Sequence, residues 1–140
     1  MAITQTLPTS FKVQLLGGLQ NFSSNSFKIA LYTSSATLDA GTTVYTTSNE
    51  VSGTGYTAGG NALTVSVAPT SSGTTAYISF NDTSWYTATF TARGALIYNT
   101  SQANAAVAIF DFGSDKSVVG GTFTITFPAA TSSSAVIRIA

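Results

Sequence analysis

Apolar and polar residues alternate in repeated short runs along this chain, which is the pattern of β-strands with one buried face. The clearest run is 122–127, where three apolar side chains fall on one face and three threonines fall on the other. β-Branched threonine suits the exposed side of a pleated strand. The same alternation predicts further strands at 27–32, 62–67, 75–80 and 135–139.

Three more segments are predicted strands of a different composition. The segments 95–98 and 106–112 are apolar on both faces, which favours central strands or strands covered on both sides. A strand over about 84–91, around Trp85, brings the predicted set to about eight. Turn signals separate these runs, and they lie at 71–73, 81–82, 93–94, 99–104, 113–115 and 120–121.

One segment, Pro8–Leu16, is a predicted helix. It has a proline near its start and Gly17–Gly18 as a stop signal. An N-terminal strand or arm is the competing interpretation, because apolar residues also alternate in this segment. No other segment has the helical period that βαβ crossovers need, so the residues predict one all-β domain over 1–140, as a sandwich, jelly roll or small barrel.

The composition excludes most kinds of catalysis. The chain has no Cys and no His, and its five basic and five acidic residues give zero net charge. It therefore has no thiolate or imidazole for a metal site, a cysteine nucleophile or an imidazole base. We predict that the chain is not an enzyme and has no metal, cofactor or small-molecule substrate.

The distribution of charge and of apolar residues excludes two further classes of partner. The five basic residues are scattered without a cluster, which argues against phosphate-mediated binding to nucleic acid. The first residues do not resemble a secretory signal, and no window approaches the roughly 18 apolar residues of a membrane span. We expect no nucleic-acid partner, no membrane partner and synthesis in the cytoplasm.

The segment 49–60 contains four glycines and loosely matches a dinucleotide-binding pattern. The match fails in context, because Gly59 and Gly60 follow at once and the next predicted element is a strand rather than a helix. We interpret the segment as a structured loop whose glycines allow positive φ or close backbone approach. Its aromatic residue, Tyr56, either contacts a partner or fixes its own loop.

Asp111 and Asp115 are four residues apart and flank Ser114, which is a conceivable cation site. Calcium usually takes six to eight oxygen ligands, and this spacing matches no standard loop. A polar turn is the preferred interpretation, with Asp115 paired to Lys116 or capping the backbone. No two carboxylates can be assigned as the pair that a glycoside hydrolase needs.

Charged residues make up only 7% of the chain, whereas 19 Ser and 24 Thr supply most of its polarity. A β-domain with so few charges has little electrostatic protection against edge-to-edge association, and burial in an assembly provides that protection. A structural or interaction protein that forms a homo-oligomer is therefore expected. The candidate interface residues are Tyr56, Trp85 and Tyr86, because exposed aromatic side chains often anchor interfaces.

Five segments, spread over nearly the whole chain, resemble one family: 11–16, 21–32, 49–60, 92–98 and 111–116. That family comprises small virion proteins of tailed phages, in particular capsid cement or decoration proteins with a jelly-roll fold. The resemblance implies a jelly-roll-like antiparallel sandwich that binds the phage major capsid protein on the outside of the shell and stabilises the capsid. The alternative is a tail, neck or fibre component, including one that binds a receptor. No functional residue is carried over from the family.

Overall fold

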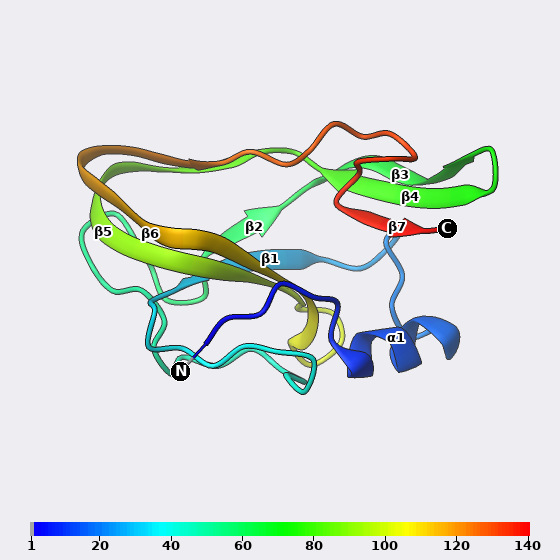
Figure 1. Cartoon of the computed structure of the whole chain (residues 1–140), viewed down its shortest axis with the longest axis horizontal. Helices are drawn as coiled ribbons and strands as arrows, with labels where there is room; N and C mark the ends of the chain where they lie inside the picture. Colours follow the sequence, from blue (N-terminus) through cyan, green and yellow to red (C-terminus); the bar gives the residue numbers. More distant parts are fainter. Residues whose placement is uncertain (1) are drawn as a thin grey trace.

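The computed structural model describes residues 2–140 and has an all-β antiparallel architecture with one short helix, as predicted (Figure 1). One sheet has the strand order β2-β1-β5-β6, and the other has the order β3-β4-β7. The elements are α1 (Thr9–Leu16), β1 (Phe27–Tyr32), β2 (Asn61–Leu63), β3 (Val65–Ser72), β4 (Thr75–Phe80), β5 (Thr83–Asn99), β6 (Ala105–Ile125) and β7 (Ile137–Ile139).

The described chain forms seven strands, and the difference from the predicted set has a specific cause. The segments 84–91 and 95–98 are parts of β5, and 106–112 and most of 122–127 are parts of β6. The predicted turns at 93–94, 113–115 and 120–121 were wrong, because these glycines lie at or beside shifts in pairing register within one long hairpin. The segment 62–67 is instead divided between β2 and β3.

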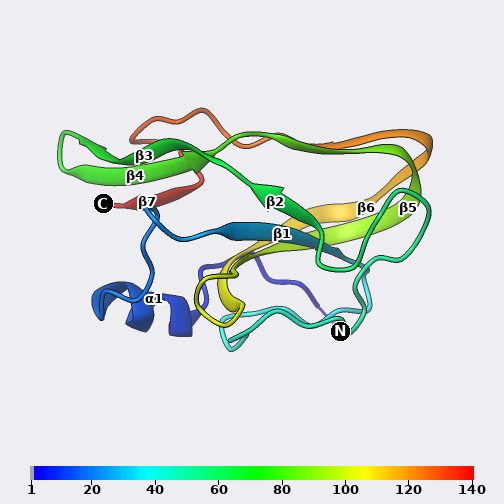
Figure 2. The same cartoon turned by 180° about the vertical axis from the view of Figure 1, so that it is seen from behind.

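The β5–β6 hairpin is strongly bent and connects the two layers. Its inner half, where Gly94–Asn99 pairs with 105–111, lies beside β1. Its outer half, where Thr83–Ala92 pairs with 116–125, turns back at one end of the molecule and runs toward β4 (Figures 1 and 2). The register shifts are the irregularities that let both strands bend together.

The predicted helix is confirmed as α1, which begins after Pro8 and ends before Gly17. Phe11 is its buried side chain, and this ring packs edge-on against Phe22. The helix lies at the end of the molecule opposite the hairpin bend, on the same side as β3, β4 and β7. No helix in the described chain is long and apolar enough to cross a membrane.

The core has two parts, one on each face of the sheet that contains β1. The larger cluster lies between the layers and is rich in phenylalanine, including Phe27 and Phe80. The smaller cluster lies on the outer face, where Leu96 and Ile109 are covered by the N-terminal segment and by the chain after β1. Burial on both faces confirms the interpretation of 95–98, and in the predicted run 106–112 it extends only as far as Ile109.

Candidate functional site

The carboxylate of Glu50 is the centre of a side-chain hydrogen-bond network and accepts three hydrogen bonds. Its Oε1 accepts a hydrogen bond from the Tyr45 hydroxyl at 2.7 Å. Its Oε2 accepts hydrogen bonds from the Tyr56 hydroxyl at 2.6 Å and from the Gly59 N–H at 2.8 Å. We call these four residues the Glu50 clamp. The clamp joins four points of the segment 45–59, so one carboxylate fixes the shape of the glycine-bearing loop.

The backbone of this segment continues the sheet where β2 stops. β2 pairs with β1 only as far as Ile29. Beyond that point Val51 donates its N–H to the Leu31 carbonyl at 2.9 Å, and Tyr32 forms a bridge with Glu50. Leu31 donates its own N–H to the Tyr56 hydroxyl at 2.9 Å. The Tyr56 side chain therefore satisfies a buried backbone donor that a neighbouring strand would otherwise satisfy.

The ring of Tyr56 packs into the molecule and not away from it. It stacks on Trp85 with 6.0 Å between centroids and meets Phe90 edge-on at 5.8 Å. The residue is half-buried and contacts the larger core cluster. Of the two roles considered for Tyr56, fixing its own loop is the one that these contacts describe.

Two glycines of the loop make close backbone approaches that a side chain would prevent. A Cβ at Gly55, which has φ +82°, would lie 2.8 Å from the Ala88 Cα. A Cβ at Gly60, which has φ +76°, would overlap the carbonyl of Ile29. The loop leads directly into β2 and not into the helix that a dinucleotide-binding loop needs, and its glycines make the close backbone approaches that we expected.

Burial and the nearby Glu50 charge raise the tyrosine pKa values in this region. Burial is the larger cause, and it raises the pKa of Tyr98 to about 12. The pKa values of Tyr32, Tyr45 and Tyr56 are raised further, again mainly by burial. These hydroxyls stay protonated at neutral pH and act as hydrogen-bond donors, so the geometry is that of a structural network.

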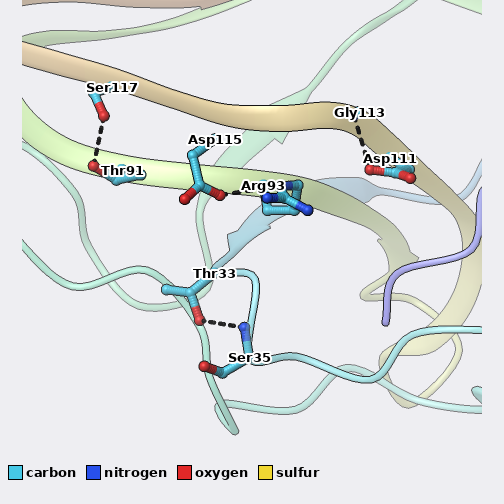
Figure 3. Close-up of polar contacts among 8 residues, drawn as sticks. All are labelled: Thr33, Ser35, Thr91, Arg93, Asp111, Gly113, Asp115 and Ser117. Atoms are coloured by element: carbon cyan, nitrogen blue, oxygen red, sulfur yellow. Dashed lines mark hydrogen bonds and ion pairs between the residues drawn. The ribbon is translucent and has the colours of Figure 1, made fainter. Parts of the chain in front are cut away.

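The two aspartates considered for a cation are held by other contacts (Figure 3). Asp111 accepts a hydrogen bond from the Gly113 N–H at 2.9 Å, within the irregular part of β6 between Asp111 and Lys116. Asp115 pairs with Arg93 at 3.0 Å and not with Lys116, the partner that the sequence suggested. Residues 2–140 contain no group of three or more carboxylate, His or Cys side chains that could hold a metal ion.

Hydroxyl pairs accompany this ion pair along the bend. Thr91 and Ser117 face each other across β5 and β6 with 2.7 Å between their oxygens. Below them in the same view, the Thr33 hydroxyl accepts the Ser35 N–H at 3.4 Å, in the turn after β1. These contacts connect neighbouring parts of the chain.

Two of the three predicted interface residues are engaged inside the molecule. Trp85 is only 3% exposed and packs against Tyr56 and Phe90, so its side chain belongs to the core and does not have the exposure that an anchor needs. Tyr86, the next residue, is 71% exposed. Tyr86 is therefore the predicted residue that remains available at the surface.

Tyr86 lies in a β-bulge within the outer half of the hairpin. The pairing shifts register between Trp85 and Ala88, and Thr87 has φ +50°, a strained value for a β-branched residue. A second shift follows at once on the other side of Ala88, and it contains Val119, which is 85% exposed. We call Tyr86 and Val119 the hairpin patch.

A second apolar surface lies around α1. Val13, Leu16 and Leu19 are exposed there, Leu16 at 91%. Beside them is an open cavity of about 340 Å³ between the end of α1 and the sheet β3-β4-β7. We call this cavity the helix groove, and its apolar lining includes Leu15, Phe22, Pro69, Ile78, Ile137 and Ile139. The sequence did not predict this surface, because apolar residues on a predicted helix are equally typical of buried core positions.

The chain was compared with known proteins, and no family model, curated protein or solved structure matches it.

Proposed function

We propose that the chain is a structural virion protein of a tailed phage that binds the outside of the assembled capsid shell and stabilises it. Its partners in this role are the major capsid protein and neighbouring copies of the chain. The family resemblance of the five segments supports the proposal, and the glycine-bearing stretch, 49–60, is also the segment that the Glu50 clamp holds.

The observation that carries the proposal is the presence of two separate exposed apolar surfaces, one on α1 and one on the outer half of the β5–β6 hairpin. Leu16 is 91% exposed on α1, and Val119 is 85% exposed on β6. Exposed apolar patches mark sites of protein association. A molecule with two separate patches can contact two neighbours at once, which suits a component of a repeating surface.

Shell stabilisation fits the rest of the chemistry. A protein that binds only the assembled form stabilises that form by mass action, and many identical weak contacts add up over a shell. Uncharged hydroxyl, amide and apolar groups are sufficient for such contacts. The bent hairpin, the two-sided core and the Glu50 clamp provide a rigid body for repeated placement.

Particles that lack the protein provide the test, with purified protein added back. We expect binding to assembled shells but not to free capsid subunits, together with a rise in the temperature at which the shells break. Raising the salt from about 0.05 M to about 0.5 M should have little effect, because screening acts on charges that this surface mostly does not have. Release of the protein by salt alone, or binding without any gain in shell stability, would contradict the proposal.

A further inference from the structure

We propose that the protein binds a neutral sugar, without cleaving it, in the open cavity beside residues 110–112 of β6. We call this the Asp111 cavity, and its volume is about 530 Å³. Sites for small molecules typically enclose about 300–1,000 Å³, so a small sugar is of suitable size. The inference goes beyond the proposed function and does not depend on it, because every residue that it uses belongs to this chain.

Three parts of the chain enclose the Asp111 cavity: the inner half of β6, the N-terminal segment, and the chain from the end of β6 to β7. Its lining includes Ile29 and Ala95, which are completely buried. It also includes Asp111 and Arg138, which are exposed. The cavity therefore extends from the surface to the core, with its charged groups on the outside.

The apolar part of the lining is largely aromatic. Phe110 and Phe112 are half-buried, and Phe127 meets Phe110 edge-on with 6.4 Å between ring centroids. The face of an aromatic ring carries partial negative charge and attracts C–H groups that carry partial positive charge. The C–H groups of a sugar ring are of this kind, because most of its carbons bear an oxygen. These phenylalanines therefore suit the face of a sugar ring.

Asp111 and Gln5 have hydrogen-bonding groups that the described chain does not use. Asp111 Oδ1 accepts the Gly113 N–H, and no residue within 2–140 donates to Oδ2. Gln5 Oε1 accepts the Asp111 N–H at 3.2 Å, and the amide nitrogen of Gln5 has no partner in the same range. One acceptor and one donor group therefore remain at this side of the cavity.

Arg138 supplies further donors. Its Nη1 donates to the Ser132 carbonyl at 3.1 Å, and a guanidinium has five N–H groups in all. Within the described residues Arg138 forms no ion pair, because the ion pair found there joins Arg93 and Asp115. The charges of Asp111 and Arg138 therefore cancel in sum, although the two side chains do not pair with each other.

These groups select a ligand that carries several hydroxyls. The Asp111 carboxylate only accepts hydrogen bonds, whereas Arg138 and the amide nitrogen of Gln5 only donate them. A hydroxyl does both from one atom, so neighbouring hydroxyls can satisfy all three groups. The lining has no net charge, which argues against a charged ligand. A neutral sugar has hydroxyls at its edge and C–H groups on its faces, and it matches both parts of the lining.

The same residues favour binding over cleavage. Asp111 is the one carboxylate side chain in the lining, whereas hydrolysis of a glycosidic bond typically uses two. Two lining hydroxyls are hydrogen-bonded elsewhere, Thr124 to Ser84 at 2.8 Å and Ser134 to the Ala129 carbonyl at 2.8 Å. The cavity therefore has the groups to hold a sugar but not a pair of carboxylates to hydrolyse it.

Titration of the isotope-labelled full chain, followed by its amide NMR signals, tests the binding. The neutral probes are methyl glucoside, methyl galactoside, methyl mannoside and N-acetylglucosamine, and glucuronate and trialanine are the charged and peptide probes. We expect at least one neutral sugar to shift the signals of Ala95 and of residues 110–112 saturably, with Kd between about 1 and 10 mM. No saturable shift by any neutral probe at about 50 mM, or shifts confined to other residues, would overturn the inference. Tighter binding of glucuronate or trialanine at the same residues would overturn the choice of a neutral sugar.

Two variants each remove one polar group of the cavity. Asp111→Asn keeps an oxygen for the Gly113 N–H and converts the free acceptor into a donor, so it should bind the sugar about tenfold more weakly. Arg138→Gln removes the guanidinium and should have a loss of about the same size. The matched controls Asp115→Asn and Arg93→Gln make the same chemical changes outside the cavity and should bind like the parent chain.

The comparison of the four variants decides whether the sugar lies where we place it. Unchanged affinity in both cavity variants would mean that the sugar contacts other groups, and equal losses in the controls would mean a general effect of charge. Either result overturns the inference, and the amide spectrum of each variant shows that it is folded. All of these measurements use free protein, so their failure is distinguishable from a failure to bind shells.

Discussion

Replacing Tyr56 with Phe removes one oxygen atom from the Glu50 clamp and leaves the ring between Trp85 and Phe90. That oxygen donates a hydrogen bond to Glu50 Oε2 at 2.6 Å and accepts one from the Leu31 N–H at 2.9 Å. Because the ring stays, the change isolates the value of two hydrogen bonds from that of aromatic packing.

The expected cost follows from what each partner loses. Leu31 is completely buried, and an unsatisfied buried donor costs about 1–3 kcal/mol. Glu50 is half-buried and keeps two other donors, so water offsets much of its loss, and about 1 kcal/mol is expected there. The total is about 2–4 kcal/mol, a large part of the 5–15 kcal/mol that typically separates folded from unfolded states.

Urea unfolding measures this difference. With a slope of about 2 kcal/mol per molar, in the middle of the typical range, the midpoint should fall by about 1–2 M while the slope stays the same. Tyr86→Phe is the matched control, because that ring is exposed, and it should change stability by less than about 0.5 kcal/mol. A Tyr56→Phe chain as stable as the control would refute the role assigned to the clamp.

Two further predictions concern the same region. The free energy of unfolding should be constant up to about pH 10 and then fall, because tyrosines of the unfolded chain ionise near pH 10 while burial holds the pKa of Tyr98 at about 12. Urea midpoints measured against pH give the slope, which should approach about 1.4 kcal/mol per pH unit for each protected tyrosine. The slope should be shallower in Tyr98→Phe. Gly60→Ala should destabilise the fold by several kcal/mol more than Gly73→Ala. Both glycines have positive φ, but only at Gly60 would the added Cβ overlap a backbone carbonyl, that of Ile29. Equal decreases in stability, measured by thermal unfolding, would contradict this close approach.

The strands and the helix were predictable because their signals are local. Alternation located β1 and β4, although β1 is buried on both faces and Ala76 of β4 is exposed, and Pro8 with Gly17 marked the ends of α1. The glycines at 93–94 and 120–121 were misread for a physical reason. A glycine indicates that the backbone departs from regular geometry, but not whether pairing resumes beyond it, and here it does.

The Glu50 clamp was not predictable from local pattern. Tyr45, Glu50 and Tyr56 are spaced by five and six residues in a segment with no regular period, and their meeting depends on the path of the loop beside β1. The one available signal was a single acidic residue in a long uncharged stretch that also holds two tyrosines. The burial of Trp85 likewise depends on the loop that covers it.

The number of copies per particle tests the proposed role most directly. Quantitative mass spectrometry of purified virions, calibrated against the major capsid protein, gives that number. A protein that covers the shell should be present in hundreds of copies and remain with the heads when the tails are removed. A few to a few dozen copies that separate with the tails would place the protein in the tail, neck or fibre and contradict a capsid role.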